Sequence, residues 1–189
     1  LDVASSHFYD EAKGIYHLHS EDRALSSGQM IDMLEKWTKE HPVISIEDGL
    51  AENDWEGWQD LTQRLGKNVQ LIGDDLFTTN KLRLQKGFDM KAGNSILVKM
   101  NQIGTLTETV NTLRMAKNGG FSTVVSARSG ETEDATLADL AVGLNGGQIK
   151  IGSVAGSSRL AKYNQLLRIN EEIGSNYAGS SVFKSFGLY

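Results

Sequence analysis

The stretch Val124-Val-Ser-Ala-Arg-Ser-Gly-Glu-Thr-Glu-Asp134 sets the pattern that the rest of the chain repeats. The β-branched run at residues 122–125 predicts a buried strand that breaks at Ser126, and a helical pattern begins after Glu131. A strand, a polar turn and a helix start together direct free backbone N–H groups toward an anion. Arg128 adds a charged fork that suits phosphate or carboxylate, and Ser129 adds a hydroxyl. The simpler interpretation is a capped helix start with solvent-exposed charges, and the stretch alone leaves both open.

The same succession of apolar run and helical pattern occurs along most of the chain. Strands are predicted at residues 43–46, 69–72, 95–98, 122–125 and 148–152. Helical patterns begin at Ser27, Asn53, Lys81 and Thr105 and after Glu131, and a last one runs through Leu166 to Ile173. Capping-box spacing supports two of these starts, Asn53 with Glu56 and Thr105 with Glu108.

Three segments do not fit that succession. Residues 1–6 read as the end of a strand that runs into a loop, and residues 101–104 read as a turn. Residues 8–25 read as irregular, and His17 and His19 are interpreted as exposed loop residues because no third metal ligand is near them. The Ser/Gly-rich residues 174–189 read as a tail, either poorly ordered or docked on a neighbour.

Strands that alternate with helices indicate parallel βα units, and a regular interval of roughly 25 residues is typical of a (β/α) barrel. The competing architecture is a doubly wound sheet, but no Gly-rich dinucleotide fingerprint follows any predicted strand. The fold class is therefore α/β, a TIM-type barrel. We count about six βα units where a full barrel has eight, and expect a partial catalytic barrel domain over residues 1–173 followed by the tail 174–189.

Composition narrows the class of protein. A length of 189 residues suits one domain, and a net charge of −5 argues against a nucleic-acid partner. The sequence contains no cysteine, which excludes disulfides and thiolate metal sites, and no apolar run approaches the ~18 residues of a membrane span. We expect a cytoplasmic protein with no membrane partner.

Charged side chains stand at the ends of successive predicted strands, where a barrel has its active site. Asp2, Glu47 and Asp74 supply three hard oxygen ligands, which suit Mg²⁺. Lys99 and Lys150 follow them, with Arg128 and Ser129 in between. Carboxylates facing cations are costly to bury unless they hold ligands, so the expected contents are a divalent cation and a small polyanion. The alternative, in which each charge merely ends a strand at a solvated rim, is disfavoured by the number of charges in register.

Seven motifs in order carry a resemblance to a known family. They are Asp2-Val-Ala-Ser-Ser6, Ser45-Ile-Glu-Asp48, Gly73-Asp-Asp-Leu-Phe77, Leu97-Val-Lys-Met-Asn-Gln-Ile-Gly104, Arg128-Ser-Gly-Glu-Thr-Glu-Asp134, Gly147-Gln-Ile-Lys150 and Arg159-Leu-Ala-Lys-Tyr-Asn-Gln165. Together they closely resemble the carboxy-terminal barrel portion of enolase (phosphopyruvate hydratase), a lyase of glycolysis, over nearly the whole chain.

The resemblance implies a role for each candidate residue. Asp2, Glu47 and Asp74 would bind Mg²⁺, and a second Mg²⁺ would bind through the substrate. Lys99 would contact the substrate and remove the C2 proton of 2-phosphoglycerate, Lys150 would stabilise the resulting charge, and Arg128 and Ser129 would hold the phosphate. The products would be phosphoenolpyruvate and water, and the complete protein would be a homodimer or larger homo-oligomer.

Departures from the family pattern qualify these roles. Ala127 stands where most relatives have a histidine, and residues 156–159 read Gly-Ser-Ser-Arg where relatives usually carry an Arg and a Glu. The family's amino-terminal domain, its first barrel strands and the glutamate that protonates the leaving hydroxyl would precede Leu1. We therefore expect the isolated chain to be weakly active or inactive, and the alternative function is that of a catalytically deficient fragment serving as a structural or binding module.

Overall fold

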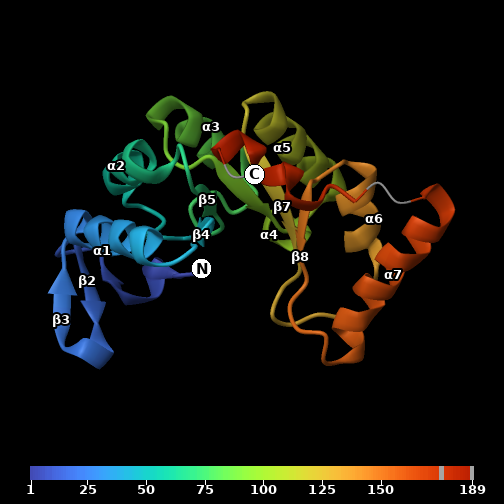
Figure 1. Cartoon of the computed structure of the whole chain (residues 1–189), viewed down its shortest axis with the longest axis horizontal. Coiled ribbons are helices and arrows are strands. Elements are labelled where there is room, and N and C mark those ends of the chain that lie inside the picture. Colours follow the sequence, from blue (N-terminus) through green and yellow to red (C-terminus); the bar gives the residue numbers. More distant parts are fainter. Residues whose placement is uncertain (175–176, 188–189) are drawn as a thin grey trace.

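Five parallel strands form one sheet in the sequential order β4-β5-β6-β7-β8 in the computed structural model, which describes residues 1–174 and 177–187 (Figure 1). The strands are β4 (Ser45–Glu47), β5 (Gln70–Gly73), β6 (Ser95–Val98), β7 (Ser122–Ser126) and β8 (Gln148–Lys150). A parallel bridge between Asp2 and Glu47 places the start of the chain beside β4. Because the order never reverses, the sheet is part of a barrel and not a doubly wound sheet. The predicted fold class is confirmed.

Helices follow the strands as the sequence predicts. They are α1 (Ser27–Glu40), α2 (Trp55–Leu65), α3 (Lys81–Met90), α5 (Leu106–Asn118), α6 (Thr136–Gly143) and α7 (Ser157–Ile173). However, α6 begins later than predicted, and α7 begins at Ser157, nine residues before the predicted Leu166. The predicted turn at residues 101–104 is instead a short helix, α4 (Met100–Ile103), which ends at Gly104 with a positive φ of 99°. None of the helices in the described ranges is long and apolar enough to cross a membrane.

Each strand turns alternate side chains to opposite faces of the sheet, and both faces bury apolar groups. Leu71, Ile96 and Val125 belong to the main core on the face that the helices cover, together with Trp58 and Leu84. Their sequence neighbours form a second, separate cluster on the inner face, namely Ile72, Leu97 and Val124. The strands are therefore buried on both sides, as is usual for a parallel sheet.

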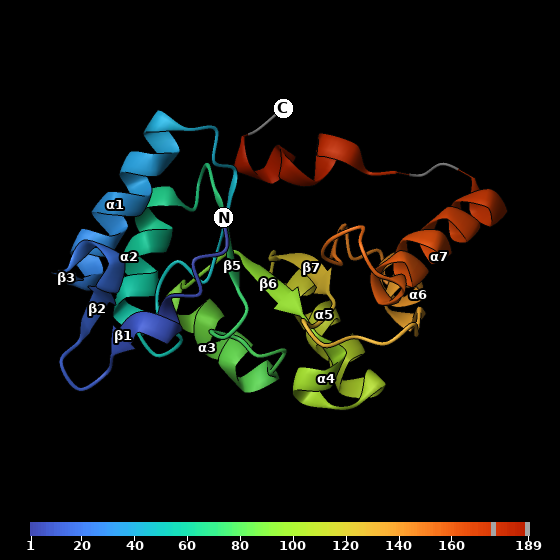
Figure 2. The same cartoon turned by 90° about the horizontal axis from the view of Figure 1, so that it is seen from below.

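At the start of the strands the inner face is polar. The Gln70 side-chain amide donates to Ser95 Oγ and Ser122 Oγ, both at 3.0 Å. The described part of the tail lies at the same end of the sheet, because a Cβ on Gly147 would stand 3.7 Å from Val182 in the 3-10 helix η3 (Gly179–Phe186). Figure 2 shows η3 on the side of the sheet opposite to α3 and α5, and Phe186 is buried. Residues 175–176 and 188–189 of the predicted tail lie outside the described residues.

The expectation that residues 8–25 are irregular is wrong. They form an antiparallel three-stranded sheet of β1 (Tyr9–Asp10), β2 (Ile15–Leu18) and β3 (Arg23–Leu25), with short 3-10 turns η1 (Ser5–Phe8) and η2 (His19–Glu21) at its edges. Tyr16 on β2 is fully buried, and its hydroxyl donates to Asp54 Oδ2 at 2.6 Å. Strands of two to four residues are too short to show an alternating pattern, which is why the sequence did not predict them.

One predicted helix cap is wrong and another is confirmed. The cap of α2 is Asp54, whose side chain accepts from the Gly57 backbone N–H, and Asn53 instead donates to Glu11 on the first hairpin. Thr105 caps α5 as predicted, and its side chain accepts from the Glu108 N–H. A one-residue error in a cap position is common when several Asx residues are adjacent.

Candidate active site

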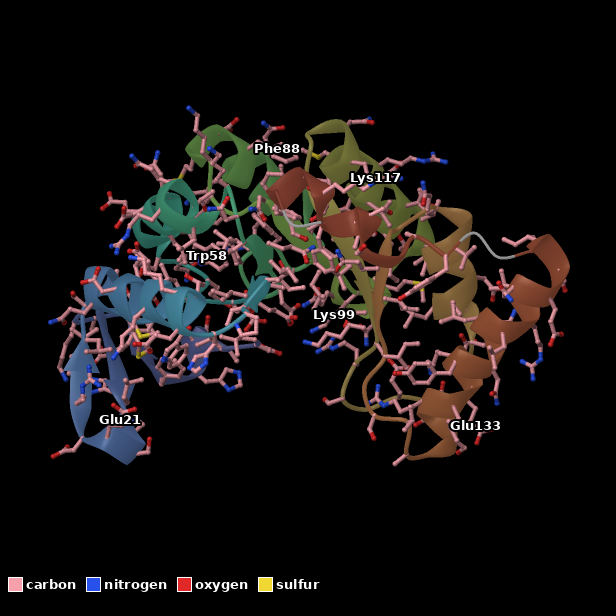
Figure 3. The ribbon with its side chains drawn as sticks, in the orientation of Figure 1. Glu21, Trp58, Phe88, Lys99, Lys117 and Glu133 are labelled. Atoms are coloured by element: carbon pink, nitrogen blue, oxygen red, sulfur yellow. The ribbon has the colours of Figure 1, made fainter. Side chains whose placement is uncertain are left out.

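The alternation within each strand extends to the residues at the strand ends and brings the predicted site residues to one face. Glu47 ends β4 and Lys150 ends β8, while Asp74 and Lys99 directly follow β5 and β6. All four continue the side-chain rows of the inner face, above the apolar cluster of that face. Figure 3 shows Lys99 near the middle of the molecule.

Lys150 joins the two edges of the sheet. Its ammonium donates to both oxygens of Glu47 at 2.8 Å and to Asp2 Oδ2 at 2.9 Å. β4 and β8 are the outermost of the five strands, which would lie about 19 Å apart in a flat sheet because neighbouring strands are ~4.8 Å apart. The contact therefore requires a strongly curved sheet, and it closes the mouth of the partial barrel.

The charges of this group are unequally buried. Only 6% of the Glu47 side chain is exposed, whereas 43% of the Lys150 side chain is exposed. Burial raises the pKa of Glu47, and the hydrogen bond from Lys150 opposes that rise without cancelling it. For Lys150, burial lowers the pKa, but the contacts with Glu47 and Asp2 outweigh burial and raise it above its usual value. Glu47 is thus a carboxylate that needs a nearby cation.

A second ion pair, between Lys99 and Asp74, lies on the neighbouring strand ends and is almost fully buried, with 13% and 12% of the two side chains exposed. The other oxygen of Asp74 accepts from Gln102 Nε2 at 2.9 Å. Thr79 completes the arrangement, because its hydroxyl oxygen accepts from the Lys99 backbone N–H and donates to Gln102 Oε1, each at 2.9 Å. Lys99 and Asp74 are therefore fixed by neighbours that hold their backbone and their free oxygen.

Asp48 forms hydrogen bonds with two other chain segments, one near Ser5 and one at the end of β5 beside Asp74. Its two carboxylate oxygens accept from the backbone N–H groups of Asp74 and Asp75, each at 2.9 Å. Its own N–H donates to Ile72 O at 2.9 Å, and its carbonyl accepts from the Ser5 hydroxyl at 2.9 Å. Asp48 has a φ of 43°, in the left-handed region. Burial raises the pKa of Asp48 to about 7, against the opposing hydrogen bonds from Asp75 and Asp74. The sequence analysis did not select this residue.

Two sets of carboxylates compete as the candidate metal ligands. The predicted set is Asp2, Glu47 and Asp74, of which Lys150 joins Asp2 and Glu47, while Asp74 is paired separately with Lys99. Within the described residues, the group whose oxygens already lie within 4.8 Å of one another is Asp48, Asp74 and Asp75. Both Asp48 oxygens already accept backbone N–H groups, which leaves them less able to bind a cation. An all-oxygen donor set of carboxylates fits Mg²⁺ in either case.

Arg128 and Ser129 lie in a loop and not at a helix start. α6 begins at Thr136, so the expectation that a helix follows Glu131 directly is wrong. The Glu131 side chain accepts from the Arg128 backbone N–H at 2.7 Å, which closes a polar turn where the helix was expected. The argument from a helix dipole therefore does not apply here. The Arg128 guanidinium instead donates to Asn101 Oδ1 at 3.1 Å, two residues beyond Lys99.

Ala127 directly precedes Arg128 and contacts the backbone of Lys150. It is buried, and its backbone N–H donates to Lys150 O at 2.9 Å. The preceding Ser126 donates its hydroxyl to Ala127 O at 2.9 Å, so it is committed to the local backbone. A side chain longer than a methyl group at position 127 would have to displace core neighbours or extend toward the mouth.

Gln102 and Thr79 were also missed, although Gln102 is part of a quoted motif. A glutamine after a strand end carries no charge signal, and the contact of Thr79 with Lys99 depends on a turn between β5 and α3. Both residues act through backbone and amide contacts that sequence spacing does not predict.

Comparison with known proteins shows the family to which this fold belongs. The family described as "Enolase, C-terminal TIM barrel domain" matches residues 1–186. The chain is 54% identical over 190 residues to "Enolase 1" of Desulfitobacterium hafniense (strain Y51). That alignment covers 100% of this chain and 44% of the relative, so the chain spans less than half the length of the curated protein it matches.

Proposed function

Because the chain belongs to the enolase family, as its carboxy-terminal barrel portion, we propose that it carries the metal ligands, the base and the phosphate-binding residues of a Mg²⁺-dependent phosphopyruvate hydratase. The reaction is the dehydration of 2-phosphoglycerate to phosphoenolpyruvate and water. The proposal concerns the complete polypeptide, since the matched relative is more than twice as long as the chain.

The observation that supports it most is the pairing of two lysines with three carboxylates across the barrel mouth. Lys150 spans Asp2 and Glu47, and Lys99 is paired with Asp74. One buried and one partly exposed ion group contribute little net stability compared with apolar packing, so their presence at the mouth is better explained by a reaction than by folding.

In the proposed reaction, Lys99 takes the proton from C2 of the substrate and Lys150 stabilises the negative charge that develops on the substrate carboxylate. Asp2, Glu47 and Asp74 would hold Mg²⁺, which would lower the energy of that same developing charge. Lys99 donates to one oxygen of Asp74 and Gln102 donates to the other, so both oxygens of this candidate ligand already have partners.

Arg128 and Ser129 hold the phosphate in this proposal. The guanidinium contacts Asn101 in α4, the short helix that directly follows Lys99, so a phosphate held by Arg128 would lie on the same side of the barrel as that lysine. Departure of the C3 hydroxyl as water needs a proton from a general acid, which the family resemblance places outside these 189 residues.

The test is turnover by the complete polypeptide in the presence of Mg²⁺ and 2-phosphoglycerate, followed by the ultraviolet absorbance of phosphoenolpyruvate. Activity should disappear with a chelator and return with added Mg²⁺. The isolated 189-residue chain, assayed in parallel, should show little or no turnover, because general acid catalysis is worth roughly 10²–10⁴-fold. Robust turnover by the isolated chain would contradict the missing-acid argument, and an inactive complete polypeptide would contradict the proposed function and favour a binding role.

A further inference from the structure

Lys162 is a buried lysine that the proposed reaction does not use. It lies on α7, and only 1% of its side chain is exposed. Its ammonium donates to Thr132 O at 2.6 Å and to Ser158 O at 2.9 Å, and it pairs with Glu131 Oε2 at 2.9 Å. All of its hydrogens therefore have acceptors, and two of the three acceptors belong to the loop that follows Arg128.

Glu131 transmits this contact to the phosphate-binding residues. One carboxylate oxygen contacts Lys162, and the other accepts from the Arg128 backbone N–H at 2.7 Å. Burial alone would raise the pKa of Glu131, but the Arg128 N–H and the Lys162 ammonium outweigh it and lower that pKa. The path from α7 to the backbone of Arg128 thus consists of two charge-assisted contacts in series.

Arg159, one turn before Lys162 on α7, fixes the loop at a second point. Its guanidinium donates to Ser129 O at 2.8 Å and to Ile151 O at 2.9 Å, the residue directly after β8. The loop is thus held near both of its ends by one helix, and that helix is fastened to the strand end that carries Lys150.

We propose that Lys162, through Glu131, is a positioning residue that holds the Arg128–Ser129 loop in the geometry needed to bind the substrate phosphate. The inference rests on the proposed function, because it takes the phosphate role of Arg128 and Ser129 from it. A buried ion pair that served stability alone could be replaced, both partners together, by apolar side chains of similar volume at little cost. The three acceptors of Lys162 instead fix where the loop backbone lies, and displacement of a binding group by a fraction of a bond length weakens a site sharply.

The experiment measures steady-state kinetics of the complete enzyme carrying Lys162→Met, with Arg168→Met as the matched control. Arg168 lies on the same helix, is exposed and donates a hydrogen bond to Gln165 on that helix. Lys162→Met should raise KM for 2-phosphoglycerate by about 10- to 100-fold, the range for loss of an outer-shell partner. It should change kcat by less than about threefold and leave Mg²⁺ affinity unaltered, because within the described residues the side chains of Asp2, Glu47 and Asp74 form their hydrogen bonds and ion pairs with residues outside the loop.

Glu131→Gln keeps an acceptor for Arg128 and removes the charge that Lys162 contacts, so it should raise KM in the same direction even if Lys162→Met does not fold. Hydrogen exchange of residues 128–132 should be faster in both variants and unchanged in Arg168→Met. A folded Lys162→Met or Glu131→Gln enzyme with the normal KM overturns the inference. That result differs from an inactive wild-type enzyme, which would overturn the proposed function.

Discussion

The Lys150 ammonium contacts both oxygens of Glu47 at 2.8 Å, although the two residues lie 103 positions apart and on opposite edges of the sheet. This contact places a cation against a buried carboxylate that is one of the proposed Mg²⁺ ligands. The Lys150 ammonium therefore offsets part of the negative charge of Glu47 and Asp2, and Mg²⁺ held by these carboxylates would have to share them with the lysine.

Replacing Lys150 by Met should destabilise the metal-free protein and strengthen its stabilisation by Mg²⁺. Without Lys150, burial and the charges of Asp2 and Asp74 act on Glu47 without the opposing lysine, so its pKa should rise further. The cost should be about 1–3 kcal/mol, below the range for a fully buried pair because Lys150 is partly exposed. Thermal unfolding with and without Mg²⁺ measures it. Lys150→Arg retains a cation and serves as the control, and equal stability of the Met variant and the wild type would contradict the prediction.

Replacing Lys99 by Ala in the complete enzyme should reduce exchange of the C2 proton of 2-phosphoglycerate with solvent by about 10²- to 10⁴-fold, the usual contribution of a general base. Exchange into deuterated solvent, followed by NMR, isolates this step from loss of the hydroxyl. Lys67→Ala removes an exposed lysine outside the site and should exchange normally. Normal exchange in Lys99→Ala would remove Lys99 from the role of base.

Introducing a histidine at position 127 should tighten binding of the substrate phosphate. The side chain would follow Ser126 and precede Arg128, and one charge-assisted hydrogen bond is worth about tenfold in affinity. The gain should fade above pH ~6.5, where a free imidazole loses its charge. KM as a function of pH measures both effects, with Ala127→Asn as a control that adds a polar group without charge. Because Ala127 belongs to the buried core, each variant's melting temperature must accompany its KM.

The two candidate sets of metal ligands are separated by replacing Asp75 and Asp48. If Asp2, Glu47 and Asp74 hold Mg²⁺, then Asp75→Asn should leave Mg²⁺ affinity nearly unchanged. Asp48→Asn should lower it by about 10- to 100-fold, because an amide cannot accept from both backbone N–H groups that fix Asp74 and Asp75. Isothermal titration with Mg²⁺ distinguishes the sets. An equal loss in both variants would instead assign the metal to the close group Asp48, Asp74 and Asp75.

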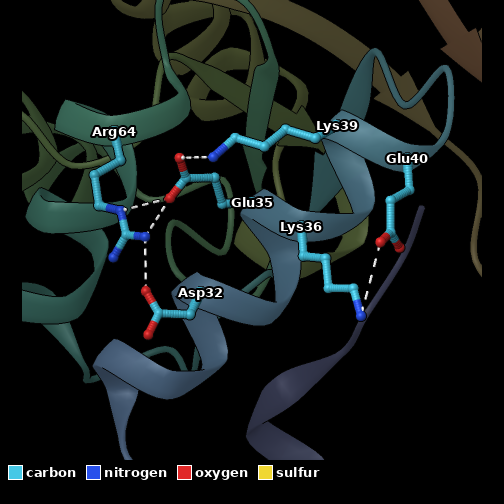
Figure 4. A pocket seen from close by; sticks show the side chains of 6 residues that line it. All are labelled: Asp32, Glu35, Lys36, Lys39, Glu40 and Arg64. Atoms are coloured by element: carbon cyan, nitrogen blue, oxygen red, sulfur yellow. Dashed lines mark hydrogen bonds and ion pairs between the residues drawn. The ribbon is translucent and has the colours of Figure 1, made fainter.

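The acid-side stability of the protein should depend on Glu35. Lys39 and Arg64 lower the pKa of this partly exposed α1 carboxylate from 4.5 to about 2 (Figure 4). Since the folded-state pKa is depressed, the stabilising effect is present above about pH 4.5 and is lost as the pH falls through about 2. Glu35→Gln should therefore show a shallower fall of melting temperature over that window. Glu40→Gln, which removes a longer ion pair of 3.7 Å with Lys36, is the control and should follow the wild type.

The barrel and most of its site could be predicted because their information is local and repeated. A short β-branched run followed by a polar residue marks each strand end, and parallel strands put these ends on one edge. Asp2, Glu47, Asp74, Lys99 and Lys150 all enter the observed ion pairs.

The features that could not be predicted depend on contacts between distant segments. The small sheet at residues 9–25 is stabilised by burial of Tyr16 against Asp54 and Ala51, not by its own pattern. The late start of α6 depends on Lys162, which lies 30 residues from Thr132, its loop acceptor. In the sequence, Asp48 is only a second acidic residue beside Glu47. The structure is needed to show that Glu47 contacts Lys150 whereas Asp48 accepts from the backbone of Asp74 and Asp75.

The left-handed backbone conformation of Asp48 carries a conformational cost that a glycine at this position would not have. An L-residue in this conformation destabilises the fold by about 1–3 kcal/mol. The two hydrogen bonds that the Asp48 carboxylate accepts from backbone N–H groups stabilise it by about 1.5–3 kcal/mol each. The strain is thus offset only while the β5 end keeps its position. Any motion that carried Asp74 away would break both hydrogen bonds at once and leave the backbone strain at Asp48 uncompensated. The turn at Asp48 therefore opposes displacement of the end of β5.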